Sequence, residues 1–83
     1  MTLDILYFAW LRERMGVPRE RVETQAATVT ELVAELIARG ERHAAALSDL
    51  SAVRVAVDQQ LTDLDASLTG AREVAFFPPM TGG

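Results

Sequence analysis

A chain of 83 residues has room for a single small domain with one core. Its net charge is −4 and all eight of its basic residues are arginine, without the basic stripe that nucleic-acid binding requires. The lack of cysteine excludes disulfides, a thiolate nucleophile and Cys-based metal sites. Because there is neither a bilayer-length apolar run nor a signal peptide, we expect a cytoplasmic protein that does not bind membranes.

The first predicted elements are two strands joined by a helical turn. Residues 2–9 have apolar side chains on both faces, which is typical of a central strand covered on both sides. The charged segment 11–15 predicts one helical turn, closed by Gly16 and Pro18. The polar run 19–24 predicts an edge strand whose charges discourage pairing with other chains.

An amphipathic helix follows these strands. Thr28 and Glu31 form a capping box, and apolar residues recur at helical spacing over residues 29–37. Gly40 is expected to end this helix, which we predict to be the main cover of the sheet. A second, weaker helix is predicted for residues 41–50.

The second half of the chain predicts three more strands. Alternating valines over residues 53–57 indicate a half-buried strand, and turn residues flank a very short strand at Leu61. The apolar run 74–77 has the signature of a buried strand, which Pro78 ends. The order of elements predicts an α+β fold with a mixed sheet.

Upstream of the end of the chain, the residues that could take part in catalysis or binding are better interpreted as structural. His43 is the only histidine and lies on a polar helical stretch, so we expect a surface position and no metal or base role. Asp63 and Asp65 could form a carboxylate pair for acid–base work, but a solvated loop is the better interpretation. Phe8 and Trp10 are expected in the core or at its edge, with an exposed partner anchor as the alternative for Trp10.

The end of the chain carries the strongest functional signal. A Pro-Pro pair is stiff and extended, so residues 78–83 should leave the sheet as a tail. Its two final glycines lack a Cβ and can enter a channel too narrow for other residues. The ionised carboxylate of Gly83 resists nucleophilic attack, so chemistry there needs activation by another protein. We therefore divide the chain into a domain of residues 1–77 and an extended tail of residues 78–83.

The two ends of the chain together resemble one family. The run Phe76-Phe77-Pro78-Pro79-Met80-Thr81-Gly82-Gly83, with Phe8-Ala9 and Arg12-Glu13 near the start, is similar to the small, sulfur-carrying subunit of molybdopterin synthase. This resemblance implies a ubiquitin-like β-grasp fold. The first and last strands would then be central and parallel, packed on one main helix.

The resemblance also implies a function. An adenylating enzyme of the ubiquitin-activating type would use ATP to convert the Gly83 carboxylate to an acyl-adenylate. A sulfur donor protein would then replace AMP to leave a thiocarboxylate. Within a heterotetramer, the large synthase subunit would transfer this sulfur to a cyclic pyranopterin phosphate precursor. Alone, the chain would be no enzyme and would bind neither cofactor nor metal.

Site residues follow from the resemblance position by position. Gly83 would bear the sulfur, Gly82 and Thr81 would line the channel, and the partner interface would comprise Phe76, Phe77, Pro78, Pro79 and Met80. Two departures concern partner contact: Asp58 stands where relatives often have Asn, and Ala71-Arg72 replaces an acidic turn. Two alternatives stay open, namely a sulfur carrier for thiamine or cysteine synthesis and a ubiquitin-like modifier joined to target lysines.

Overall fold

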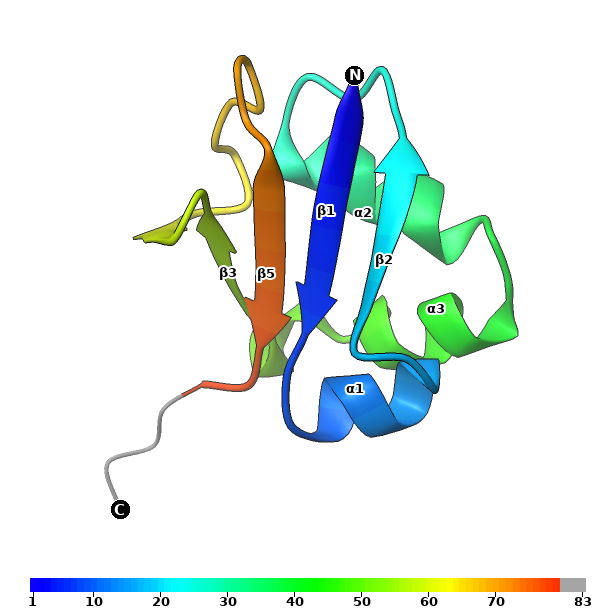
Figure 1. Ribbon diagram of the computed structural model, residues 1–83. Coiled ribbons are helices and arrows are strands. Elements are labelled where there is room, and N and C mark those ends of the chain that lie inside the picture. The colour runs from blue at the N-terminus through cyan, green and yellow to red at the C-terminus, as the bar shows by residue number, and fades with distance from the viewer. Residues whose placement is uncertain (80–83) are drawn as a thin grey trace.

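Five strands within residues 1–79, the part of the chain that the computed structural model describes, form one mixed sheet in the order β2-β1-β5-β3-β4 (Figure 1). The elements in chain order are β1 (Thr2–Tyr7), α1 (Trp10–Met15), β2 (Arg19–Glu23), α2 (Val29–Ile37), α3 (Glu41–Leu47), a 3₁₀ turn η1 (Leu50–Ala52), β3 (Arg54–Val57), β4 (Gln60–Thr62) and β5 (Glu73–Phe77). The predicted order of elements is therefore confirmed.

The first and last of these strands are parallel neighbours inside the sheet. Leu6 pairs with Ala75 and Tyr7 pairs with Phe76. On their outer sides, β1 pairs antiparallel with β2, and β5 pairs antiparallel with β3. This arrangement confirms the mixed sheet expected for a β-grasp fold.

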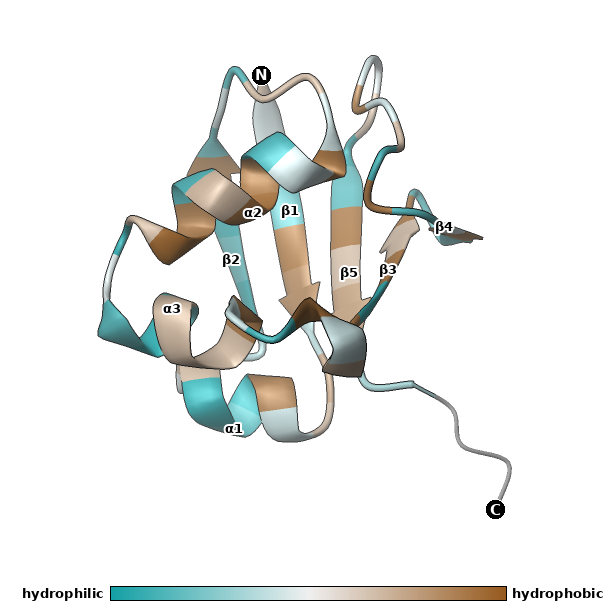
Figure 2. Ribbon diagram, turned by 180° about the vertical axis from the view of Figure 1, so that it is seen from behind, coloured by the Kyte–Doolittle hydropathy of each residue, from teal (hydrophilic) through white to brown (hydrophobic). Residues whose placement is uncertain are grey.

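The helices cover only one face of this sheet. Figure 1 looks onto the open face, and Figure 2, turned by 180°, shows α2 and α3 in front of the strands. Leu3, Ile5 and Tyr7 face the helices and are buried. On the other face Leu6 is only half-buried, and Phe8 beyond the strand is 48% exposed. The expectation that β1 is covered on both sides was therefore wrong. Apolar side chains on both faces of a strand do not show that the chain itself covers both faces.

Helix α2 is the main cover, as predicted, and its start follows the capping box. The Thr28 hydroxyl accepts a hydrogen bond from the Glu31 N–H at 3.3 Å. The Glu31 carboxylate reaches back one residue further than expected and accepts from the Ala27 N–H at 3.2 Å. The buried stripe of α2 comprises Val29, Leu32, Val33 and Leu36, and each such side chain contributes about 1.5–3 kcal/mol on burial.

The predicted end of α2 at Gly40 was wrong. The helix ends at Ile37, and the Arg39 N–H closes its last turn on the Leu36 carbonyl at 3.0 Å. Gly40 instead precedes α3 as its N-cap, in an extended conformation. The predicted helix 41–50 is correspondingly split into α3 and η1. No helix in the described range 1–79 is long and apolar enough to cross a membrane.

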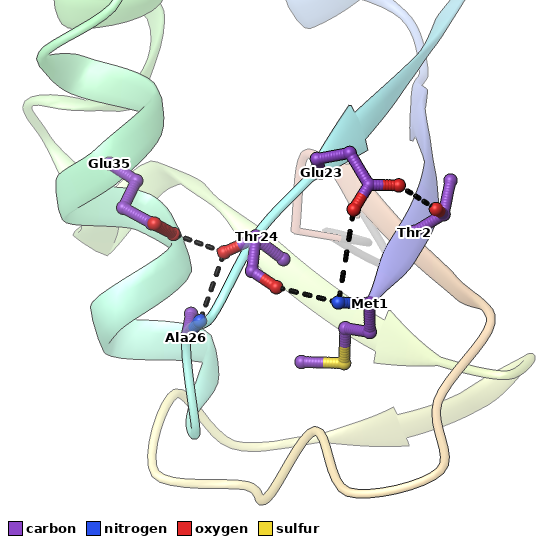
Figure 3. Close-up of polar contacts among 6 residues, drawn as sticks. All are labelled: Met1, Thr2, Glu23, Thr24, Ala26 and Glu35. Atoms are coloured by element: carbon purple, nitrogen blue, oxygen red, sulfur yellow. Dashed lines mark hydrogen bonds and ion pairs between the residues drawn. The ribbon is translucent and has the colours of Figure 1, made fainter.

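A polar corner ties the start of β1 to the end of β2 and to α2 (Figure 3). The Met1 ammonium donates to the Thr24 carbonyl at 3.0 Å, and the Thr24 N–H donates to the Met1 carbonyl at 2.9 Å. The buried Thr24 hydroxyl donates to the Glu35 carboxylate and accepts from the Ala26 N–H. These bonds satisfy the polar groups where the chain leaves the sheet, at the end of β1 opposite to α1.

Candidate functional site

The open face of the sheet carries a hollow of about 530 Å³ beside the end of β5. Its lining is mostly apolar and comes from three neighbouring strands and the segments that follow them. The lining residues are Leu6, Phe8, Ala9, Ala56, Gln59, Glu73, Ala75, Phe77, Pro78 and Pro79. We refer to this feature as the hollow.

Strand register explains why these residues meet. Leu6 on β1 and Ala56 on β3 both pair with Ala75 on β5, so the three side chains point to the same face. Two small alanines in this row leave space that larger side chains would fill. Leu61 on β4 pairs with Ala56 and extends the same row to the sheet edge, where it is 72% exposed.

Charged side chains lie around this apolar row. Asp4 and Glu73 are register partners on the open face. The Arg21 guanidinium contacts the Asp4 carboxylate at 3.0 Å, and that of Arg19 lies 3.8 Å from it. Arg54 pairs with Phe77 on the far side of β5. An apolar centre with a charged rim is the usual anatomy of a protein–protein interface.

The tail begins at this hollow. Strand β5 ends at Phe77, and the half-buried Pro78 and Pro79 follow it outside any strand and line the hollow. Proline has no N–H to continue a ladder. The other tail positions, Met80, Thr81, Gly82 and Gly83, lie outside the described residues, so their expected roles stay predictions.

Phe76 does not belong to the exposed surface of this chain. Its side chain is 0% exposed and stacks on the Tyr7 ring, with centroids 6.3 Å apart and planes at 16°. Because alternate residues of a strand point to opposite faces, Phe76 enters the core while Phe77 lines the hollow. The expected interface role of Phe76 therefore needs correction, since its ring packs within its own domain.

His43 is also placed differently from the expectation. It is only 19% exposed, and its Nε2 lies 2.7 Å from the Glu20 carboxylate, which also accepts a hydrogen bond from the Tyr7 hydroxyl at 2.6 Å. Burial raises the pKa of Tyr7, and the bond to Glu20 adds to that effect. Burial disfavours the charged form of Glu20, but the bonds from Tyr7 and His43 outweigh it and lower its pKa.

This polar network stabilises the helix-covered side. It joins β1, β2 and α3, since Tyr7, Glu20 and His43 each come from a different one of them. Sequence reasoning missed it because His43 and Glu20 are far apart in the chain. The network takes no part in lining the hollow.

The remaining candidate residues have local roles. Asp63 and Asp65 are exposed, as predicted for a solvated loop. Residues 1–79 contain no group of three or more His, Asp or Glu side chains arranged to hold a metal ion. Trp10 packs against the edge of the core, where the Arg14 guanidinium lies 5.6 Å from its ring.

Asp58 anchors the start of β5. It has φ 49°, and its carboxylate accepts hydrogen bonds from the N–H groups of Arg72 and Glu73 at 2.9 and 3.0 Å. Its own N–H donates to the Glu73 carbonyl at 2.9 Å. The residue thus has a structural role within the chain, which its sequence position alone did not indicate.

Known proteins resemble this chain over nearly its whole length. The model of the ThiS family matches residues 5–83. The molybdopterin synthase sulfur carrier subunit of Escherichia coli (strain K12) is 41% identical over 98% of this chain and 99% of its own length. The protein of the same description from Haemophilus influenzae is 37% identical over the same shares.

Solved structures share the fold. SAMP1 from Haloferax volcanii has a TM-score of 0.76 and 25% identity, with both chains covered completely. Subunits 1 and 2 of the Helicobacter pylori molybdopterin-converting factor were solved as a complex, and the matching chain has a TM-score of 0.66 and 24% identity, again with full coverage of both chains. With its parallel β1 and β5 and its single layer of helices, this chain is a member of the ThiS family with the ubiquitin-like β-grasp fold.

Proposed function

We propose that this chain is a cytoplasmic sulfur carrier, the small subunit of a molybdopterin synthase. The observation that carries the proposal is the full-length similarity to proteins described as molybdopterin synthase sulfur carrier subunits, at 41% and 37% identity. The fold supports it because the apolar hollow lies where β5 leads into the tail.

The chemistry is assigned to Gly83. Its carboxylate attacks the α-phosphate of ATP on an adenylating enzyme, which breaks the bond to the β-phosphate and releases pyrophosphate. The product is an acyl-adenylate, in which AMP is the leaving group for the next step. Sulfur at the oxidation level of sulfide, delivered by a donor protein, then attacks the carbonyl carbon. The bond to AMP breaks, AMP departs, and a thiocarboxylate is left. The six residues from Pro78 to Gly83 span at most about 20 Å. This length would let the Gly83 carbonyl carbon reach into the active site of a partner protein. The carrier itself catalyses no step.

The open face is assigned to the large synthase subunit, which transfers the sulfur to a cyclic pyranopterin phosphate precursor. Leu6, Ala75 and Ala56 form an apolar row, bordered by the larger side chains of Phe8 and Phe77. Burying such a patch on a partner is favourable, and aromatic side chains are the usual anchors. Pro78 and Pro79 restrict the backbone at the tail's exit, which reduces the conformational entropy lost on docking.

The test is the intact mass of the protein purified from cells that also make the adenylating enzyme and the sulfur donor. We expect a species heavier by the difference between one sulfur and one oxygen, located on the C-terminal peptide and removed by hydrolysis. Chains that lack Gly83, or carry one added alanine after it, serve as controls. Both should fold and bind the large subunit but support no sulfur transfer, because the reacting carbon moves by about 3.3 Å. Extra sulfur at another position, or none with both partners present, would reject the proposal.

A protein modifier is the second candidate, because one of the structural relatives is described as small archaeal modifier protein 1, with a TM-score of 0.74. As a modifier, the chain would appear joined through Gly83 to lysines of other proteins, and peptide mapping of a cell lysate for Gly-Gly remnants would detect this. Deletion of the gene separates the proposed function from the modifier and from a carrier for thiamine or cysteine synthesis. Only the proposed function predicts that molybdoenzyme activity is lost.

A further inference from the structure

Unusual backbone angles gather at the hollow. In the described part of the chain, three residues other than glycine have positive φ, namely Ala9 at 55°, Asp58 at 49° and Gln59 at 69°. Ala9 and Gln59 both line the hollow, and Asp58 directly precedes Gln59. Residues in sparsely populated backbone regions cluster at functional sites, where the surrounding structure maintains them.

The two residues bracket the hollow along β5. Ala9 follows the end of β1, where Tyr7 pairs with Phe76 near the end of β5. Gln59 follows the end of β3, where Val57 pairs with Val74 near the start of β5. The hollow between them therefore has a strained residue at each end.

Glycine would adopt both conformations more readily. Ala9 has ψ −131° together with its positive φ, a combination that side chains disfavour and glycine tolerates. Gln59 is the second residue of the two-residue turn between β3 and β4, where glycine after Asp or Asn is the preferred choice. Each side chain therefore destabilises the folded chain relative to glycine.

The Ala9 carbonyl caps α1 by accepting hydrogen bonds from the Arg12 and Glu13 N–H groups. A glycine would offer the same carbonyl, so these bonds do not account for the Ala9 side chain. The carboxylate of Asp58 makes two hydrogen bonds that explain its conformation. Ala9 is exposed and lies outside the core cluster. The exposed side chain of Gln59 makes no hydrogen bond to another residue of the range 1–79. The two side chains thus differ from that of Asp58, because no hydrogen bond or core position within residues 1–79 accounts for them.

We propose that Ala9 and Gln59 are contact residues of the docked partner, and that their side chains act only in the bound state. This inference rests on the proposed function, in which the large synthase subunit covers the open face. The Ala9 methyl group would meet an apolar surface of that subunit beside Phe8. The Gln59 amide, which both donates and accepts, would pair with a polar group at the opposite end of the hollow.

The experiment compares Ala9→Gly and Gln59→Gly in the full chain with the wild type. Both variants should melt at a higher temperature than the wild type, because the strain is relieved. Each variant should also bind the purified large subunit at least about fourfold more weakly. This is the effect of losing one buried methyl group, which Ala9→Gly removes, and Gln59→Gly removes a larger side chain. The matched control is Ala34→Gly, an exposed alanine within the regular helix α2 on the other face. It should lower the melting temperature and leave the affinity unchanged.

The possible outcomes separate the two claims. Lower melting temperatures for Ala9→Gly and Gln59→Gly would overturn the assignment of strain. If the wild type binds the large subunit and the two variants bind it equally tightly, the contact role would be overturned and the proposed function would stay intact. Failure of the wild type itself to bind the large subunit would reject the proposed function and the contact role together.

Discussion

The two faces of the sheet are built from the same strands but meet different surroundings. On one face, Ile5, Val74 and Phe76 are buried beneath helices of the same chain. On the other, Leu6 and Phe77 remain half-exposed, although they alternate with those residues along β1 and β5. Apolar character is therefore shared by both faces, and only the cover differs.

This difference separates folding from binding. Substitutions on the helix-covered face should lower the free energy of unfolding, since they leave cavities in a packed core. Substitutions of exposed or half-buried side chains on the open face, such as Phe8 and Phe77, should leave folding nearly unchanged and weaken association with the large subunit. The comparison fails if substitutions on the two faces have equal effects on the free energy of unfolding, or equal effects on the affinity for the large subunit.

Adjacent phenylalanines give the largest expected contrast. Phe76→Ala should lower the free energy of unfolding by about 3–5 kcal/mol, because it removes a fully buried ring that stacks on Tyr7. Phe77→Ala, one residue away but on the open face, is the control and should cost much less. Urea denaturation measures both. Equal losses would show that the open face contributes to folding as much as the core does.

A second contrast concerns binding. Phe8→Ala should weaken the affinity for the large subunit by about 30-fold, equivalent to the 2 kcal/mol typical of an interface anchor, and should leave the melting temperature nearly unchanged. The control is Val17→Ala, because Val17 is 41% exposed, close to the 48% of Phe8, but lies away from the hollow. Isothermal calorimetry distinguishes the two variants, and an equal effect on affinity would place the interface elsewhere.

The smallest predicted effect is the pH dependence from the network on the covered face. The pKa of Glu20 is lower in the folded chain than its ordinary value, so the unfolded chain binds more protons in acid. The stability that Glu20 contributes is present above the ordinary glutamate pKa of about 4.3 and is lost as the pH falls through the lower folded value. Melting temperatures of Glu20→Gln should therefore be lower near neutral pH and less sensitive to acid. A variant with an unchanged acid profile would show that other carboxylates dominate.

Elements with strong local signals could be predicted from the sequence. The capping box at Thr28 and the apolar spacing after it predicted α2, and the run that ends at Pro78 predicted β5. These signals involve residues within a few positions of one another. The parallel pairing of β1 and β5 came from the resemblance of both chain ends to a known family.

Features that depend on distant contacts could not be predicted in this way. A run of four apolar residues does not show that Phe76 faces inward and Phe77 outward until β5 has a partner in a fixed register. The polar contact of His43 on α3 depends on Glu20 from β2, which is distant in the sequence. The hollow requires Leu6, Ala56 and Ala75 to align across three strands, and their spacing in the sequence carries no sign of it.

The pairing of the first strand with the last has a consequence for synthesis. During translation β1 emerges first, but its interior neighbour β5 emerges only when the rest of the domain has been made. Such long-range pairing delays folding until late in synthesis. A polypeptide cut short before β5 would lack the middle of its sheet and should be degraded rather than accumulate. Every folded copy in the cell would then carry the strand that leads to the tail, so truncated carriers would not compete for the partner's binding surface.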